Sequence, residues 1–359
     1  MNKKNISIDL RMIEHSGIGT YIQSLIIPII KKLKQNHFFL LVNKNINYSK
    51  YIDSKEVVNV SYIIISSPIY SLREQIEIPL KLPSNIDLYW SPHYNIPILY
   101  KYKILVTIHD IYHIVDLSFK RSLRRIYSNF IFNIIKCKSS EIITISEFSK
   151  SELINNLNIN KNLINIIYNG VGLNWYSTSD YKKNKKLLYV GNFKKHKNLD
   201  ILINAFLKFK FSTEYELILI GGNIKSFNSV IRKKIYNCNN ITCYESMSPN
   251  DLIVHYNSAH LSIFPSIYEG FGLPPLEALV CKCPILVSDI PAFKEIYKDI
   301  AYYFNPYDES DLIKKIEFLL ENDRLTDVQI DKSVDFIKKY SWNIAVKKTV
   351  KLINRELSL

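Results

Sequence analysis

Two glutamates in the second half of the chain have the types and spacing to bind a polar ligand. Glu269 and Glu277 lie at the two ends of the segment EGFGLPPLE, which holds two glycines and two prolines. Glycine lets backbone amides approach a ligand closely, and carboxylates accept hydrogen bonds from hydroxyl groups. The segment therefore predicts a site for a ligand with both hydroxyl groups and negative charge, such as a nucleotide sugar.

A structural role explains one of these glutamates better than the other. The sequence PPLEALV is typical of a helix start, because proline is favoured in the first turn. We therefore place Glu277 in the first helical turn, where the helix dipole favours a carboxylate in any case. Glu269 precedes the helix and gains nothing from the dipole, so it is the stronger candidate for contact with a ligand.

A basic loop follows the strand predicted at residues 187–190. Gly191 ends this strand, and the KKHK run at 194–197 leads into a helix that starts near residue 198. Cations beside a helix N-terminus face the positive end of the dipole, which destabilises the helix. A bound phosphate or diphosphate would remove this conflict, and a solvated basic loop is the alternative.

Two similar turns occur in the first half of the chain. In SGIGTY, Gly17 and Gly19 precede a predicted helix, so backbone amides could approach an anion there, and a tight loop turn is the alternative. In TIHDIYHIVD, His109 follows a predicted strand, and we favour a polar ligand contact over a hydrogen-bonded edge histidine. His113 lies at helical spacing from His109, but no acidic cluster accompanies the pair to complete a metal site.

Short apolar strands that alternate with longer helical patterns would position all of these turns. One series runs from ISIDL to NIIYNG, and a second from KLLYVG to CPILVSD. Because parallel strands need crossover helices, the alternation predicts two successive doubly wound α/β domains. Ligands bind such folds at the carboxyl ends of the strands. We expect domains at 1–175 and 183–338, a closing helix within 339–359, and a linker at 171–186.

Composition limits the class of protein. The formal net charge of +14 suits anionic partners without selecting one of them, and no recognised nucleic-acid-binding module is present. Five cysteines without paired C-x-x-C spacing argue against a disulfide framework or a zinc site and favour a reduced, cytoplasmic environment. No apolar run approaches the roughly 20 residues of a membrane span. We therefore expect a protein that is soluble or, at most, attached to a surface.

One basic segment leaves membrane contact open. In residues 119–138, cationic residues come first and apolar ones later. A surface helix that packs through its apolar face explains this pattern, and binding to a membrane surface is the alternative.

The motifs together resemble the retaining glycosyltransferases of family 4, whose GT-B fold has two Rossmann-like domains that face each other across a cleft. The matching pieces, in the family's order, are SGIGTY, VTIHDIYHI, ITISEFSKSEL, IIYNGV, YVGNFKKHKN, PSIYEGFGLPPLEAL and LVSDIPAFKEI, and they cover nearly the whole chain. EGFGLPPLE is the most specific of them. The resemblance also implies that the closing helix with Trp342 crosses back onto the N-terminal domain.

The resemblance implies roles for individual residues. Glu269 would bond hydroxyls of the donor sugar, Glu277 would hold the nucleotide ribose, Lys197 would neutralise the diphosphate leaving group, and His109 would lie near the anomeric carbon. The remaining donor contacts that it implies are mainly backbone contacts, from Gly17, Gly19, Gly191, Asn192, Met247, Gly270, Phe271, Gly272 and Leu273. Two positions depart from the family pattern: Asn192 stands where many relatives have arginine, and Lys282 where they have glycine.

The implied reaction is transfer of a hexose from a nucleotide diphosphate sugar to a hydroxyl of a saccharide or lipid-linked saccharide, with retention of anomeric configuration. Mannose from GDP-mannose is the first choice, in polysaccharide or lipopolysaccharide (O-antigen) assembly. We expect no required metal and no cofactor, because Lys197 and helix N-termini stabilise the leaving group. Expected partners are the nucleotide sugar and the acceptor, with peripheral contact to an anionic membrane and no nucleic acid. A GT-B epimerase and a catalytically silent donor-binding subunit are the alternatives.

Overall fold

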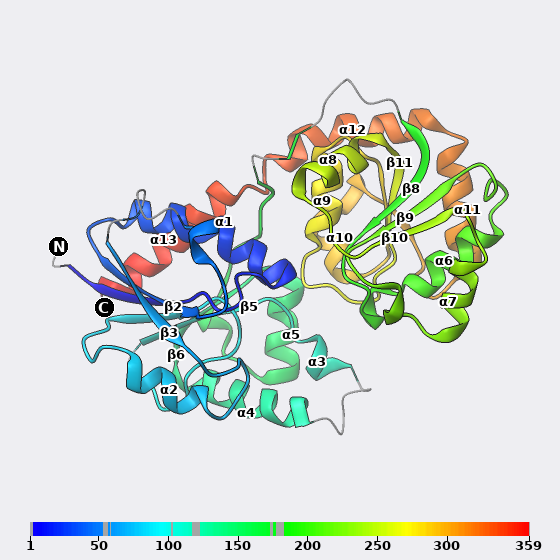
Figure 1. Cartoon of the computed structure of the whole chain (residues 1–359). Helices are drawn as coiled ribbons and strands as arrows, with labels where there is room; N and C mark the ends of the chain where they lie inside the picture. The colour runs from blue at the N-terminus through cyan, green and yellow to red at the C-terminus, as the bar shows by residue number, and fades with distance from the viewer. Residues whose placement is uncertain are drawn as a thin grey trace. The chain divides into compact units, whose positions relative to one another are not determined.

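The structure is a computed structural model of the 359-residue chain. It describes residues 3–52, 57, 59–101, 103–116, 123–172, 175–176 and 183–358. The chain divides into two compact units: the first is Met1–Gly170 with Trp342–Leu359, and the second is Val171–Ser341 (Figure 1). Residues 119–122 of the basic segment, and residues 173–174 and 177–182 of the predicted linker, lie outside the described residues.

The first unit is built on a seven-stranded parallel sheet in the order β3-β2-β1-β4-β5-β6-β7. Each strand overlaps one of the apolar runs that the sequence predicted as strands. The strands are β1 (Asn5–Asp9), β2 (His37–Asn43), β3 (Val60–Ile65), β4 (Leu88–Ser91), β5 (Lys103–Ile108), β6 (Ser139–Thr144) and β7 (Ile164–Ile166). The order steps outwards from β1 in both directions, which is the doubly wound topology that the sequence predicted.

Helices cover this sheet because their apolar residues recur at helical spacing. They are α1 (Ser16–Lys32), α2 (Glu74–Lys81), α3 (Tyr112–Val115), α4 (Leu123–Lys138), α5 (Glu147–Leu157) and α13 (Trp342–Ser358). Residues of α2, α4 and α5 share one apolar cluster with the strands. The chain's last helix, α13, contacts α1 (Figure 1). Trp342, Val346 and Ile353 are buried, so α13 completes the core of the first unit.

The second unit has a six-stranded parallel sheet in the order β10-β9-β8-β11-β12-β13. Its strands are β8 (Asn184–Val190), β9 (Glu216–Ile220), β10 (Ile241–Tyr244), β11 (Ala259–Phe264), β12 (Ile285–Ser288) and β13 (Tyr302–Phe304). Its helices are α6 (Leu199–Lys208), α7 (Ser229–Tyr236), α8 (Pro249–Ser258), α9 (Leu273–Val280), α10 (Pro291–Tyr297), α11 (Glu309–Leu320) and α12 (Asp323–Ile337). The predicted fold class, two Rossmann-like α/β domains, is confirmed.

Two strand predictions in this unit need correction. The strand β8 begins at Asn184, inside the predicted linker, because parallel pairing with β9 and β11 gives these polar residues backbone partners. The edge strand β13 was not predicted, since its three residues are too short to form a pattern. Short 3-10 helices occur at η1 (Tyr48–Lys50), η3 (Lys161–Leu163), η4 (Lys195–Lys197), η5 (Ile224–Ser226) and η6 (Lys298–Ile300). None of the described helices combines the length and apolar character that crossing a bilayer requires.

Candidate active site

The carboxyl ends of β8 and β11, which are neighbours in the second sheet, bring Lys197 and Glu269 into contact. Lys197 Nζ lies 2.6 Å from Glu269 Oε1, and Ser266 Oγ donates a hydrogen bond to the same oxygen at 2.7 Å. The two loops are also joined by their backbones, because the Ile267 amide donates to the His196 carbonyl at 2.8 Å. Both charged side chains are about one-sixth exposed, with exposed fractions of 15% and 16%.

This ion pair changes the interpretation of the basic loop. Lys197 ends η4, and α6 begins two residues later at Leu199, where the sequence predicted a helix start. The sequence suggested a bound phosphate to relieve the cation at this helix end. Glu269 already neutralises Lys197, so the cation is stable before any ligand binds.

The geometry of Glu269 still leaves acceptor capacity for a ligand. Both hydrogen bonds to its carboxylate end on Oε1, and Oε2 has no partner among the residues that the structure describes. A carboxylate has about four lone-pair positions. Glu269 can therefore accept hydroxyl hydrogen bonds while it keeps Lys197 in place.

The residues at the start of α9, the helix that follows Glu269, fix the position of its N-terminus. Gly272 has φ +90°, and a Cβ there would lie 2.5 Å from a ring carbon of Phe293. Tyr297 Oη donates to the Gly272 carbonyl, which holds the turn in place. Since Pro274 and Pro275 have no N–H, Gly272 and Leu273 supply the free amides at the start of α9.

The other backbone positions around this loop differ in what they can offer. Phe271 is buried at 2% exposure and its ring packs against Tyr340, so only its backbone can face a ligand. Gly270 is also buried. Asn192 has its carbonyl bonded to Tyr189 Oη at 2.9 Å, and its side chain accepts from the Lys194 amide at 3.3 Å. Asn192 thus shapes the loop after Gly191 and adds no charge to it.

The predicted place of Glu277 in the first turn of its helix is wrong. The helix begins at Leu273, so Glu277 lies in the second turn, and the first turn holds no acidic residue. Burial raises the pKa of Glu277 to about 7, and the Tyr256 hydroxyl offsets part of that rise. The helix dipole no longer explains this carboxylate, because the dipole's effect fades within the first turn. A half-buried carboxylate that is costly to ionise is typical of a functional group.

Met247 was expected along the nucleotide base. It lies in the loop between β10 and α8, next to Ser248, which caps α8. It is half-buried, so part of its surface is open to solvent.

In the first unit, His109 lies at the carboxyl end of β5. Its Nε2 donates to the Pro92 carbonyl at 2.9 Å, and its ring meets the edge of Tyr21 with centroids 4.8 Å apart. Burial lowers the pKa of His109, so the ring is neutral at pH 7 and Nδ1 is an acceptor. The hydrogen-bonded edge histidine that the sequence left as the alternative is therefore present, and Nδ1 remains able to contact a ligand.

The predicted position of Gly17 and Gly19 before the helix is wrong, because α1 begins at Ser16 and includes both. Gly17 is exposed, with open space around its Cα. Gly19 is buried, and a Cβ there would lie 2.4 Å from the Ile13 carbonyl oxygen. Gly19 thus allows a close approach of α1 to the preceding loop, and Gly17 is the one with a free face.

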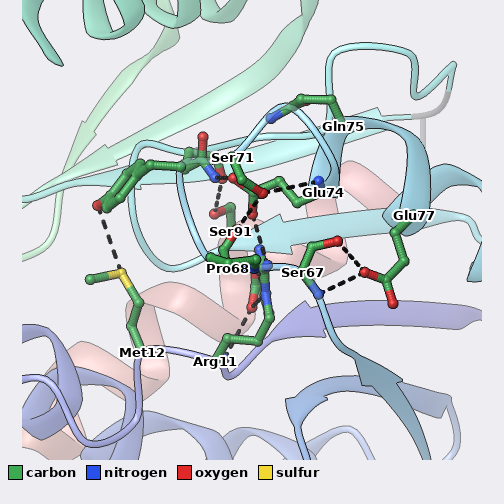
Figure 2. Close-up of polar contacts among 12 residues, drawn as sticks. Arg11, Met12, Ser67, Pro68, Ser71, Glu74, Gln75, Glu77 and Ser91 are labelled. Carbon is green, nitrogen blue, oxygen red and sulfur yellow. Dashed lines mark hydrogen bonds and ion pairs between the residues drawn. The ribbon is translucent and has the colours of Figure 1, made fainter. Parts of the chain in front are cut away.

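A buried ion network at the carboxyl end of β1 was missed by the sequence analysis. Arg11 lies between Asp9 and Glu74, at 2.7 Å from each carboxylate, and all three side chains are almost fully buried. Figure 2 shows Arg11 and Glu74 in this network. Asn95 donates to Glu74 at 2.7 Å, and Tyr127 Oη donates to Asn95 at 2.7 Å. The network joins β1, α2 and α4. Asp9 and Arg11 are two residues apart, but Glu74, Asn95 and Tyr127 come from distant segments, so no local motif predicts the network.

In the second unit, the carboxyl ends of the strands bring together Lys197, Glu269, Gly191, Asn192 and the start of α9. His109, Gly17 and Gly19 belong to the first unit.

Within the described residues, no three His, Cys, Asp or Glu side chains converge as ligands for a metal ion. His113 stacks on Tyr94 with ring centroids 4.9 Å apart. Its imidazole therefore contributes to aromatic packing.

Comparisons with known proteins define the class. Residues 51–175 match the Glycosyltransferase Family 4 family, and residues 177–338 match the family of Glycosyl transferases group 1. A solved structure of Anabaena HepE in complex with UDP-glucose has the same fold, with a TM-score of 0.78 over 98% of this chain and 99% of that chain at 15% identity. The chain belongs to the group 1 glycosyltransferases, which have the GT-B fold.

Two curated proteins with sequences similar to this chain carry glycosyltransferase names. The chain is 32% identical over 245 residues to the O-antigen chain mannosyltransferase RfbU of Salmonella typhimurium, and the match covers 66% of each chain. It is 28% identical over 355 residues to an uncharacterized glycosyltransferase, MJ1178, of Methanocaldococcus jannaschii, and that match covers 95% of each chain. The Salmonella match thus spans about two-thirds of that relative's length.

Proposed function

We propose that this enzyme transfers a hexose from a nucleoside diphosphate sugar to a hydroxyl of a saccharide or lipid-linked saccharide, with retention of anomeric configuration. The observation that carries the proposal is the Lys197–Glu269 pair at the carboxyl ends of β8 and β11. It combines a cation for a diphosphate with a carboxylate for sugar hydroxyls, in a chain that belongs to a glycosyltransferase family.

Lys197 would stabilise the leaving group. As the bond between the anomeric carbon and the diphosphate oxygen breaks, negative charge develops on that oxygen. An ammonium group has three donors, so Lys197 can bond a phosphate oxygen while it keeps its bond to Glu269. The free amides of Gly272 and Leu273 would add donors near the same ligand.

The two glutamates and His109 would orient the substrates. Glu269 would accept sugar hydroxyls through Oε2, and Glu277 would accept the ribose hydroxyls. The acceptor oxygen bonds to the anomeric carbon on the face that the diphosphate leaves, and the acceptor proton passes to the departing diphosphate oxygen. No strong general base is needed in that scheme. Because burial lowers the pKa of His109, its Nδ1 is a weak base, and we assign it the acceptance of a substrate hydrogen bond.

The relative RfbU supports the choice of the first donor sugar. RfbU is an O-antigen chain mannosyltransferase, so GDP-mannose is the first donor to test and assembly of a surface polysaccharide is the first context. The UDP-glucose in HepE makes UDP-sugars the second set. The reaction would take place in the cytoplasm, and a lipid-linked acceptor would bring it to the inner face of the membrane.

A donor screen followed by mass measurement of the products tests this proposal. Incubation with GDP-mannose and UDP-sugars should release nucleoside diphosphate and should add one hexose to a hydroxyl acceptor. An epimerase would instead yield an isomeric nucleotide sugar, and a silent donor-binding subunit would bind the donor without turnover. Either of those outcomes would overturn the proposal.

We also propose that the reaction needs no metal ion and no cofactor, because Lys197 supplies the positive charge at the leaving group. Activity should be unchanged in the presence of a chelator and in protein stripped of metal. A loss of activity that is restored by a divalent cation would contradict this prediction.

A further inference from the structure

Two buried tyrosines hold the backbone of the two loops that meet at the candidate active site. Tyr297 of α10 donates its hydroxyl to the Gly272 carbonyl, at the start of α9. Tyr189 of β8 donates to the Asn192 carbonyl at 2.9 Å, in the loop that follows that strand. The two tyrosines are 0% and 1% exposed. Each hydroxyl therefore lies on the core side of the loop that it holds.

The carbonyl that each tyrosine holds shares a peptide group with the N–H of the next residue. Both peptide groups are trans, so the C=O and the N–H of each point in opposite directions. The amides of Leu273 and Phe193 therefore point away from the buried hydroxyls. Neither amide has a hydrogen-bond partner among the residues that the structure describes, and both residues are only half-buried. Each tyrosine thus aims one unpaired N–H outward from the core.

A third buried tyrosine makes a similar bond without this consequence. Tyr256 of α8 donates to the Pro274 carbonyl at 3.3 Å, in the first turn of α9. The residue that follows is Pro275, which has no N–H. Tyr256 therefore stabilises the start of the helix but orients no donor, whereas Tyr297 and Tyr189 each orient one.

The loop after β8 is shaped to admit the tyrosine hydroxyl. A Cβ at Gly191 would lie 2.6 Å from Tyr189 Oη, so a larger residue there would displace the hydroxyl from the Asn192 carbonyl. The ring of Phe193 packs closely on Gly222, where a Cβ would lie 2.5 Å from Phe193 Cγ. The peptide between Asn192 and Phe193 is therefore fixed by the hydroxyl on one side and by the packed ring on the other.

The carboxylate of Glu269 lies close enough to act on both tyrosines. Burial raises the pKa of Tyr189 and of Tyr297 well above the usual value, and the negative charge of Glu269 adds to each rise. Both hydroxyls keep their protons at neutral pH and so remain donors. The two aimed amides therefore belong to the same site as the ion pair between Lys197 and Glu269.

We propose that Tyr297 and Tyr189 are positioning residues for the transfer reaction. They orient the amides of Leu273 and Phe193 as fixed donors for the departing diphosphate, so the inference rests on the proposed function for the identity of the ligand. Donors that are aimed before charge develops stabilise that charge without the cost of reorientation. The tyrosines do not touch the ligand, because both are buried, and they act through the backbone.

Removal of each hydroxyl tests the proposal. Tyr297→Phe and Tyr189→Phe keep the ring that fills the core but leave a carbonyl without its donor, so the peptide group can rotate. Each variant should lower kcat by about tenfold and keep the donor KM within about twofold, because charge on the diphosphate oxygen is greatest in the transition state. Affinity for GDP or UDP, whichever the wild type binds, should also fall by about tenfold, because the free diphosphate carries that full charge. Steady-state kinetics and calorimetric titration measure the two effects.

Tyr302→Phe is the matched control. Tyr302 Oη also donates to a backbone carbonyl of the second unit, that of Leu325 in α12 at 3.1 Å. Neither β13 nor α12 carries a residue of the candidate site, so this variant should keep the wild-type kcat and nucleotide affinity. All variants are assayed well below the lowest thermal unfolding midpoint, so that a loss of stability does not itself lower the rate.

Three results would count against the proposal. Wild-type kcat and nucleotide affinity in folded Tyr297→Phe or Tyr189→Phe would overturn the role of that tyrosine and leave the proposed reaction intact. An equal loss of kcat in Tyr302→Phe would overturn both roles, because any lost tyrosine bond would then have the same effect. A wild-type protein that binds neither GDP nor UDP would overturn the proposed function as well.

Discussion

Lys197 and Glu269 form a partly buried ion pair whose members hold each other in position before a donor binds. From the sequence, Glu269 gains nothing from the helix dipole, whereas Glu277 has a structural role at the helix start. The structure reverses part of this contrast, because Glu269 neutralises Lys197 and Glu277 lies beyond the first turn of α9. Both remain donor-site candidates, for different physical reasons.

Removing either member of the pair should slow the reaction sharply. We expect Lys197→Ala and Glu269→Ala each to lower turnover by a factor on the order of 10² or more, as for loss of a group that stabilises charge. The double variant should lose little more than either single one, because residues that act as a unit are not additive. Steady-state kinetics with the identified donor and acceptor check this.

A surface ion pair supplies the matched control. Lys208 and Glu309 also meet at 2.6 Å, but the Lys208 side chain is 63% exposed. Lys208→Ala should leave turnover near the wild-type value. Near wild-type rates in Lys197→Ala would refute the role assigned to Lys197.

The raised pKa of Glu277 predicts a pH dependence of stability. In the unfolded chain this carboxyl group loses its proton near pH 4.5, and in the folded chain near pH 7. Between these values the folded state binds more protons, so the free energy of unfolding falls as pH rises. Glu277→Gln should remove this fall and stabilise the second unit above pH 7 by about 1–3 kcal/mol. Thermal unfolding at pH 5 and pH 8 measures the difference.

Affinity for the nucleotide should rise with pH, whereas the free energy of unfolding falls. If the Glu277 carboxylate accepts the ribose hydroxyls, affinity for the nucleoside diphosphate should increase as pH rises through about 7. In Glu277→Gln the affinity should be weaker and should lose this dependence. Calorimetric titration at several pH values measures it, and identical pH profiles in the two proteins would contradict the role in ribose binding.

At the scale of elements, residues with positive φ angles fix both ends of helix α9. Gly272 starts it with φ +90°, and Lys282 follows its end with φ +53°. The Lys282 amide bonds the Leu279 carbonyl at 3.0 Å, and the Cys283 amide bonds the Ala278 carbonyl at 2.9 Å. These two bonds form a Schellman motif, in which glycine is the preferred residue at the position of Lys282.

Substitutions at the two ends of α9 should act in opposite directions. Lys282→Gly should stabilise the second unit by about 1 kcal/mol, because the left-handed conformation strains a residue with a Cβ. Gly272→Ala should destabilise it, since the new Cβ would lie 2.5 Å from the Phe293 ring. Denaturant unfolding of both variants checks this, and destabilisation by Lys282→Gly would show that the lysine side chain has a role of its own.

At the scale of the whole molecule, the chain returns to its first unit after the second is complete. Helix α13 belongs to the first unit and packs on α1, where Trp342 meets Tyr21 with ring centroids 6.1 Å apart. The folding of the first unit therefore depends on residues at both ends of the sequence.

Deleting residues 342–359 should destabilise the first unit selectively. The deletion removes the buried side chains of Trp342, Val346 and Ile353 and exposes the face of α1 against which α13 packs, and large losses of buried apolar surface cost several kcal/mol. Calorimetry should show one transition at a much lower temperature and a second one unchanged. An equal shift of both transitions would contradict independent cores. Truncation after Asn354, which keeps these buried residues, is the control.

The sequence by itself determined the two α/β domains and selected EGFGLPPLE and the KKHK loop as the chemical site, because strands and turns are set by local patterns of apolar residues and glycine. Only the tertiary structure decided that Lys197 pairs with Glu269, that Arg11 lies buried between Asp9 and Glu74, and that burial raises the pKa of Glu277. The reason is physical: contacts between residues far apart in the sequence, and the burial that shifts a pKa, arise only when separate elements pack together.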